Sequence, residues 1–152
     1  MTLEGKDSKR DCMALANAKS QPLTSGKLKL MICDDSNIIR RKIERELQID
    51  RLQVIATAAN GKLAVEAFRK EPADVVTMDL TMPEMDGIEI LRALRGGPAP
   101  PRVLVMTGGS VLLKRDFLDA ARMLGADATI AKPFGASDLA AAVAEALAAR
   151  RP

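Results

Sequence analysis

Five short apolar runs alternate along the chain with longer segments of mixed polarity, starting near residue 27. The segments between the runs carry helical periodicity and are too long for hairpins, so neighbouring runs are predicted to be parallel strands. The pattern predicts an α/β fold, a doubly wound five-stranded parallel sheet with helices on both faces. The predicted strands are Leu28–Cys33, Leu52–Ala58, Asp74–Asp79, Arg102–Thr107 and Asp127–Ala131.

The segments between the strands place apolar side chains at the spacing of one helix face. A fourth helix is predicted to begin near Lys114, after a loop at Gly108–Leu113, and to stop at Gly125. Phe117 and Phe134 are predicted to lie in the core. The inward positions of the other helices are predicted to be Ile39, Ile43 and Leu47; Ala64, Ala67 and Phe68; Ile88, Leu91 and Leu94; and Leu139, Val143 and Leu147.

Residues 1–26 show no sustained periodicity and end in a linker-like stretch, Ser20–Gly26. They are predicted to form a flexible N-terminal extension, and residues 27–150 to form one domain. The formal net charge of +3 belongs to the first 29 residues, because residues 30–152 carry equal numbers of acidic and basic side chains. A charged tail of this kind is usually solvated.

Composition excludes several function classes. The chain has no His, which removes imidazole metal ligands and Ser–His or Cys–His catalysis. It has no Trp or Tyr and only three Phe, so it offers little surface for stacking nucleic-acid bases, and nucleic acid is not an expected partner. No apolar run approaches the roughly 20 residues of a membrane helix. Two lone cysteines, Cys12 and Cys33, favour a reducing, cytoplasmic location.

Five polar residues interrupt the apolar pattern where strands end: Asp34, Asp35, Asp79, Thr107 and Lys132. In a doubly wound sheet these ends meet at one edge, so the side chains are expected to converge. Clustered carboxylates repel one another unless a cation joins them, and an all-oxygen donor set favours Mg²⁺. The ammonium of Lys132 and the hydroxyl of Thr107 suit phosphate oxygens. Asp79 is then a candidate nucleophile toward phosphorus.

Each of these residues has a simpler explanation when taken alone. Asp34 and Asp35 could cap the following helix, and Asp79 could be an acid of a turn. Thr107 could serve strand propensity, and Lys132 could be a surface lysine. Complementary groups at four separate strand ends favour a common site instead.

Four stretches together resemble the receiver domain of bacterial two-component response regulators, and the resemblance covers roughly residues 27–150. It implies a flavodoxin-like fold with strand order 2-1-3-4-5. The stretches are Ile32-Cys33-Asp34-Asp35-Ser36, the segment from Met78-Asp79 through Pro83 to Gly87, Met106-Thr107-Gly108, and Ala131-Lys132-Pro133-Phe134.

The resemblance implies that Asp79 accepts a phosphoryl group from a phospho-His on a sensor histidine kinase or a phosphotransfer protein. Lys132 is expected to contact the phosphoryl group, Thr107 to move toward it, and the Lys132–Pro133 bond to be cis. The implied Mg²⁺ ligands are the carboxylates of Asp34, Asp35 and Asp79 and the backbone carbonyl of Thr81.

One position departs from the pattern. Members of this family often carry Tyr or Phe three residues before the Lys, where its side chain follows the movement of the Thr. Here that position is Thr129. Thr107 and Thr129 are therefore the predicted switch residues, and the change is expected to pass through backbone shifts or through Phe117 or Phe134.

These observations predict a single-domain response regulator that signals by phosphorylation-dependent protein–protein contact. It is not expected to be a conventional enzyme, although it would catalyse its own phosphorylation and dephosphorylation at Asp79. One alternative is a binding module of the same fold that is never phosphorylated. The other is an aspartyl-phosphate phosphatase of the haloacid-dehalogenase type, which needs a second acid where this chain has Thr81.

Overall fold

The computed structural model describes residues 26–47, 51–80, 87–108 and 111–149, with the backbone alone for residues 111–115. The predicted extension, apart from Gly26, lies outside the described residues, as does Thr81.

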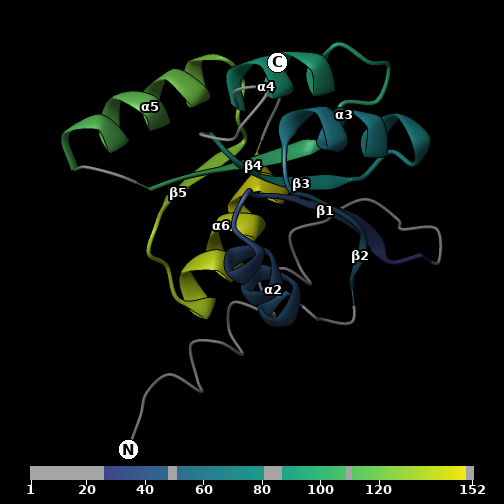
Figure 1. Ribbon diagram of the computed structural model, residues 1–152, viewed down its shortest axis with the longest axis horizontal. Helices are drawn as coiled ribbons and strands as arrows, with labels where there is room; N and C mark the ends of the chain where they lie inside the picture. Colours follow the sequence, from purple (N-terminus) through teal and green to yellow (C-terminus); the bar gives the residue numbers. More distant parts are fainter. Residues whose placement is uncertain (1–25, 48–50, 81–86, 109–110, 150–152) are drawn as a thin grey trace, which may run out of the picture.

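Five strands form one parallel sheet in the order β2-β1-β3-β4-β5 (Figure 1). The predicted fold class and strand order are confirmed, and two of the predicted strands start one residue too early. The register of β1 against β2 shifts once, between Leu30 and Met31. The strands are β1 Leu28–Cys33, β2 Leu52–Ala58, β3 Val75–Asp79, β4 Arg102–Thr107 and β5 Ala128–Ala131.

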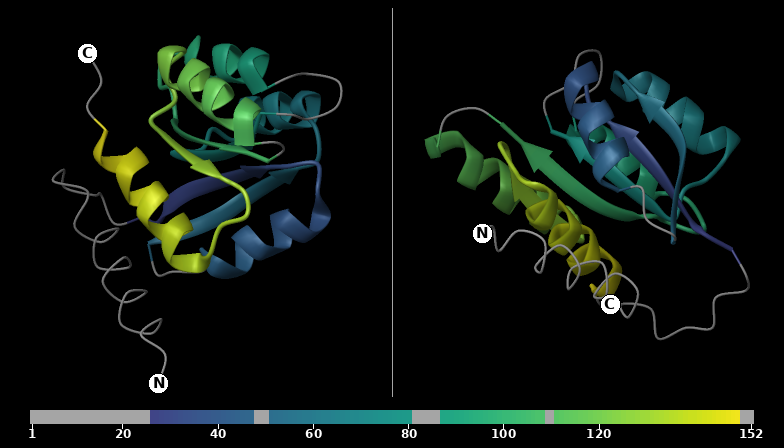
Figure 2. Two further views of the ribbon diagram at one scale, coloured as in Figure 1. Left: turned by 90° about the vertical axis from the view of Figure 1, so that its left-hand side faces the viewer. Right: turned by 90° about the horizontal axis from the view of Figure 1, so that it is seen from below.

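Among the described residues, five helices cover the sheet, α2 and α6 on one face and α3, α4 and α5 on the other (Figures 1 and 2). In the described part of the chain, none of them is both long and apolar enough to cross a membrane. The helices are α2 Asn37–Glu46, α3 Gly61–Lys70, α4 Gly87–Arg95, α5 Val111–Met123 and α6 Ala136–Ala148.

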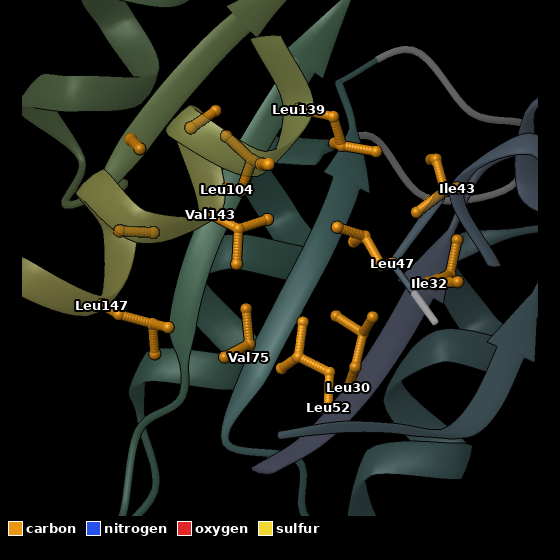
Figure 3. Close-up of a cluster of buried hydrophobic side chains, with 14 of the residues drawn as sticks. Leu30, Ile32, Ile43, Leu47, Leu52, Val75, Leu104, Leu139, Val143 and Leu147 are labelled. Atoms are coloured by element: carbon orange, nitrogen blue, oxygen red, sulfur yellow. The ribbon is translucent and has the colours of Figure 1, made fainter. Parts of the chain in front are cut away.

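Alternating side chains of each strand enter two separate cores, because successive residues of a strand point to opposite faces. In β1, Leu30 and Ile32 pack toward α2 and α6, whereas Met31 and Cys33 pack toward α3 and α4. Figure 3 shows the first core, in which helix side chains meet strand side chains across the sheet face. Its labelled members are Leu30, Ile32, Ile43, Leu47, Leu52, Val75, Leu104, Leu139, Val143 and Leu147.

Helix α5 differs from its prediction in two ways. It begins at Val111 instead of near Lys114, so the expected loop at Gly108–Leu113 is wrong in its second half. Phe117 is 40% exposed and is not a core residue, whereas Phe134 is buried as predicted. Among the described side chains of α5, residues 116–123, only Ala121 is buried.

Glycine is required where the chain returns from β3 to α4. A Cβ atom built on Gly87 would lie 2.6 Å from the Cα of Leu80, which is closer than real Cβ contacts come. The Gly87 N–H also donates to the carbonyl of Leu80 at 2.9 Å. This close approach holds the start of α4 against the residue that follows Asp79.

Asp127 ties together the edge of the sheet opposite to the carboxyl ends of the strands. Asp127 accepts a hydrogen bond from the Val103 N–H at 2.9 Å and lies 3.7 Å from Arg95 Nη1 and 3.5 Å from Arg102 Nη1. Arg95 also donates to the carbonyl of Gly125. One carboxylate thus joins the end of α4 to the starts of β4 and β5.

Replacing Asp127 with Ala is expected to lower the free energy of unfolding by about 2 kcal/mol, because it leaves the buried Val103 N–H without its acceptor and removes the carboxylate beside two guanidinium groups. Denaturant titration of the metal-free protein measures the change. Asp119→Ala, an exposed acid on α5, is the matched control and is expected to stay within about 0.5 kcal/mol of wild type. An equal loss of unfolding free energy in both variants would contradict the stabilising role of Asp127.

Candidate active site at the carboxyl edge of the sheet

The end of β1 places one acid inside the protein and the next one on its surface. Asp34 is completely buried and its N–H donates to the Ala58 carbonyl at 3.0 Å, whereas Asp35 is exposed. Ser36 is the N-cap of α2, and its hydroxyl accepts from the Ile39 N–H. The Ser36 N–H donates to Asp34 Oδ1 at 2.9 Å, so the start of the helix fixes the orientation of the buried carboxylate.

Lys132 joins the ends of three strands. Its Nζ donates to Asp34 Oδ2 at 2.6 Å and to Asp79 Oδ2 at 3.0 Å. Asp79 is the last residue of β3 and is buried, and Lys132 follows β5 directly. The sequence predicted that these side chains converge, and the structure brings them together.

Three carboxylates lie close enough to share a cation. One oxygen each from Asp34, Asp35 and Asp79 lies within 4.8 Å of the others. Lys132 bonds to two of these acids, and in the described part of the chain no second ammonium does so; three carboxylates thus outnumber the ammonium, and their hard oxygen donors suit Mg²⁺. The residues present therefore fit the predicted ion. The expected fourth protein ligand, the carbonyl of Thr81, lies outside the described residues.

Burial and charge act against each other at this site. Burial raises the pKa of Asp34 above its ordinary value, although hydrogen bonds from Lys132 and from the Ser36 N–H partly offset it. Burial alone lowers the pKa of Lys132, but hydrogen bonds to Asp34 and Asp79 outweigh that effect and raise it. Burial, followed by the charge of Asp34, raises the pKa of the Cys33 thiol to about 12. Cys33 is therefore a protonated core residue and not a ligand.

Replacing Asp34 with Asn is expected to stabilise the metal-free protein at neutral pH, because the burial that raises the pKa of Asp34 disfavours its ionised form. The raised pKa of Asp34 means that the folded state keeps a proton that the unfolded chain has released. Wild-type stability therefore falls as the pH rises from the ordinary carboxyl range through the raised value, and the variant lacks this loss. Urea titrations in EDTA across this pH range measure the difference.

The same variant is also expected to lose most of the stabilisation that Mg²⁺ gives wild type, because a bound ion stabilises only the state that holds it. The prediction is wrong if wild type is the more stable protein in EDTA at neutral pH, or if the gap between the two proteins does not widen with pH.

The two predicted switch residues occupy different surroundings. Thr107 is buried at the end of β4, and its hydroxyl donates to the carbonyl of Gly108 at 3.2 Å. Thr129 pairs in register with Val105 and lines a hollow of about 300 Å³ between β5 and α6. Its hydroxyl oxygen is buried and has no hydrogen-bond partner among the described residues. Thr129 is thus near the site in sequence but faces a separate hollow.

Two basic side chains of α2 contact the site in ways that the sequence pattern did not reveal. Arg40 Nη1 donates to the backbone carbonyl of Asp34 at 2.6 Å, and Lys42 Nζ donates to that of Phe134 at 2.6 Å. The only sign of these two contacts in the sequence is that the helix after the acid pair contains basic residues. The Lys132–Pro133 bond is cis, as the resemblance implied.

A sequence model of the response regulator receiver domain matches residues 30–144, most of the chain. The chain belongs to the response regulator receiver domain family. Membership explains why the receiver domain places its acids, Thr107 and Lys132 at strand ends.

Curated relatives of this receiver domain differ in length. The chemotaxis protein CheY of Bacillus subtilis is 35% identical over 115 residues, which cover 76% of this chain and 93% of CheY. The probable transcriptional regulator ycf27 of Pyropia yezoensis is 35% identical over 117 residues, which cover 77% of this chain but 46% of that protein. The chain thus spans less than half the length of several curated relatives that it matches.

Solved structures give the same result for the fold of the receiver domain. CheY in the CheX-CheY-BeF3-Mg complex from Borrelia burgdorferi has a TM-score of 0.71 at 28% identity, over 79% of this chain and 89% of that one. The receiver domain of the response regulator NarL from Mycobacterium tuberculosis has a TM-score of 0.73 at 25% identity, over 82% of this chain and 99% of that one.

Proposed function

We propose that this receiver domain, residues 27–150, acts as a single-domain response regulator of a two-component or phosphorelay system. Asp79 accepts a phosphoryl group from the phospho-His of a sensor histidine kinase or a phosphotransfer protein, with Mg²⁺ as cofactor. The protein works in the cytoplasm and signals through a protein target, with neither nucleic acid nor membrane as a partner.

The observation that carries the proposal is the position of Asp79. Its carboxylate is buried at the sheet edge, bonded to the Lys132 ammonium at 3.0 Å and grouped with the two other acids within 4.8 Å. A carboxylate held between a cation site and an ammonium is oriented as a nucleophile, with positive charge on both sides of the incoming phosphoryl group.

The transfer exchanges one bond to phosphorus for another. An oxygen of Asp79 forms a bond to phosphorus as the P–N bond of the phospho-His breaks, and the electron pair of that bond stays on the imidazole nitrogen. Lys132 stabilises the charge on the phosphoryl oxygens. Mg²⁺ held by Asp34, Asp35 and Asp79 would supply further neutralisation of that charge. Water later attacks phosphorus and releases inorganic phosphate, which restores the Asp79 carboxylate.

Phosphorylation adds negative charge and new acceptor oxygens beside Thr107. The Thr107 hydroxyl leaves the carbonyl of Gly108 and donates to the phosphoryl group instead. Movement at the end of β4 then shifts β5, which carries Thr129, and biases the surface that the target reads. In the absence of an aromatic ring at Thr129, this shift passes through the backbone and the packing of β5.

Incubation with acetyl phosphate and Mg²⁺, followed by intact mass spectrometry, tests the proposal. Wild type is expected to gain one phosphoryl group that EDTA prevents, hydroxylamine removes and peptide mapping places on Asp79. The proposal is overturned if neither acetyl phosphate nor a phosphorylated histidine kinase modifies the protein, or if the group maps elsewhere. Turnover of p-nitrophenyl phosphate would point to the phosphatase alternative.

A further inference from the structure

Helix α2 reaches both sides of the site through two main-chain carbonyls. Arg40 holds the carbonyl of Asp34, and Lys42 holds that of Phe134, each at 2.6 Å. Asp34 is the fully buried acid of the site, and Phe134 lies two residues after Lys132. Lys132 Nζ bonds to Asp34 Oδ2 at 2.6 Å. Helix α2 is therefore linked by hydrogen bonds both to Asp34 and to the segment that carries Lys132, and these two are bonded to each other.

Lys42 is well placed to fix the segment that carries Lys132. Its Nζ lies 5.0 Å from the centre of the Phe134 ring in addition to its bond to the Phe134 carbonyl. The Phe134 ring is buried and so anchors the segment in the core between α2 and α6. Lys42 is itself half-buried, and its ammonium is the group that reaches the backbone.

Two backbone hydrogen bonds hold the two ends of the same segment. The Lys132 N–H donates to the Thr107 carbonyl at 2.8 Å, which continues the pairing of β5 with β4. The Gly135 N–H donates to Asp138 Oδ2 at 3.0 Å, at the start of α6. Between these two points, in the part of the chain that the structure describes, the side chain that bonds to the backbone is that of Lys42, through the Phe134 carbonyl.

We propose that Lys42 is a positioning residue for Lys132. By holding the Phe134 carbonyl, its ammonium fixes the backbone from which Lys132 reaches Asp34 and Asp79. Removing that ammonium leaves the acids and their cation site unchanged but lets the Lys132 amine move away from the reacting oxygen. The role of Lys42 in phosphoryl transfer rests on the proposed phosphorylation of Asp79.

Two substitutions separate the ammonium from the stem. Lys42→Met keeps an unbranched apolar side chain over the Phe134 ring and removes the donor, whereas Lys42→Arg keeps a cationic donor. Arg41→Met, an exposed neighbour on the same helix, removes one charge as the matched control. The phosphorylation rate with acetyl phosphate at saturating Mg²⁺ is expected to fall about tenfold in Lys42→Met, because small misplacement of a reacting group is costly. Lys42→Arg is expected to recover most of that rate, and Arg41→Met to match wild type.

A double-mutant cycle distinguishes positioning from a general structural effect. If Lys42 acts through Lys132, the loss caused by Lys42→Met disappears in a Lys132→Met background, since residues coupled through a shared backbone segment are not additive. The Mg²⁺ affinity of Lys42→Met is expected to equal that of wild type. The inference is overturned by a wild-type rate in Lys42→Met, by an equal loss in Arg41→Met, or by a loss that persists undiminished without Lys132.

A second measurement decides the inference even if Asp79 is never phosphorylated. NMR of the side-chain ammonium groups reports Lys132 Nζ directly in the unmodified protein. In Lys42→Met the Lys132 signal is expected to shift and to exchange faster with water, whereas Arg41→Met leaves it unchanged. An unchanged Lys132 signal in Lys42→Met would overturn the positioning role, while absence of phosphorylation in wild type would overturn the proposed function alone.

Discussion

Replacing Asp79 with Asn is expected to abolish the gain of a phosphoryl group while leaving the protein folded. The amide oxygen is a far weaker nucleophile than a carboxylate, and loss of a nucleophile costs at least about 10³-fold in rate. The variant keeps the shape of the side chain, and its amide oxygen can still accept the hydrogen bond that Lys132 Nζ donates at 3.0 Å in wild type. Intact mass spectrometry after incubation with acetyl phosphate and Mg²⁺ measures the gain.

Stability separates a chemical effect from a folding defect in this experiment. The substitution removes one negative charge from a site where two buried acids share one lysine and a third, exposed acid lies within 4.8 Å, so the metal-free variant is expected to be at least as stable as wild type. Asp116→Asn, an exposed acid on α5, is the control and should be phosphorylated at the wild-type rate. A phosphoryl gain in Asp79→Asn equal to that of wild type would place the acceptor elsewhere.

The fold followed from the sequence because its strands are apolar runs that end at polar residues. Leu28–Cys33 and Leu52–Ala58 have the predicted bounds, since a polar residue or turn marks both ends. The helices were less certain, because several faces of a short helix can look apolar. In α4 Ile90 is buried and Ile88 only partly so, which shifts the predicted stripe around the helix. Packing against the sheet selects the face, and periodicity alone does not encode it.

The candidate site was also largely predictable, because parallel strands bring their ends to one edge. Position in the pattern was enough to group Asp34, Asp79 and Lys132. It could not reveal that Lys132 bonds to both acids, nor that Arg40 and Lys42 bind backbone carbonyls. Every residue carries such a carbonyl, so the sequence gives no sign of which one a side chain will reach; only the packing of α2 decides it.

Replacing Lys132 with Met is expected to slow phosphorylation and to destabilise the metal-free protein. The rate is expected to fall about 10²- to 10³-fold, as is usual when a donor to developing negative charge is removed. The free energy of unfolding is expected to fall by about 3 kcal/mol, because the buried acids Asp34 and Asp79 lose their cationic partner. Lys62→Met, on the exposed side of α3, is the control for loss of one surface lysine.

The pH dependence identifies the cause of the instability. Lys132 lowers the pKa of Asp34 against the effect of burial, so its removal raises that pKa further. A carboxyl with a raised pKa in the folded state costs stability as the pH climbs from the unfolded value through the folded one. The gap between wild type and Lys132→Met is therefore expected to be largest at neutral pH and to shrink as the pH falls toward the ordinary carboxyl range.

Mg²⁺ should also reduce the difference in unfolding free energy between wild type and Lys132→Met, because a cation bound to the acids replaces part of the charge that Lys132 supplied. Denaturant titrations of both proteins, with Mg²⁺ and with EDTA, measure this effect at each pH. If the deficit of Lys132→Met does not change with either pH or Mg²⁺, the lost stability comes from packing of the Lys132 stem and not from the unpaired acids. The phosphorylation rate, in contrast, is expected to stay low at every pH and Mg²⁺ concentration, because neither restores a donor to the phosphoryl oxygens.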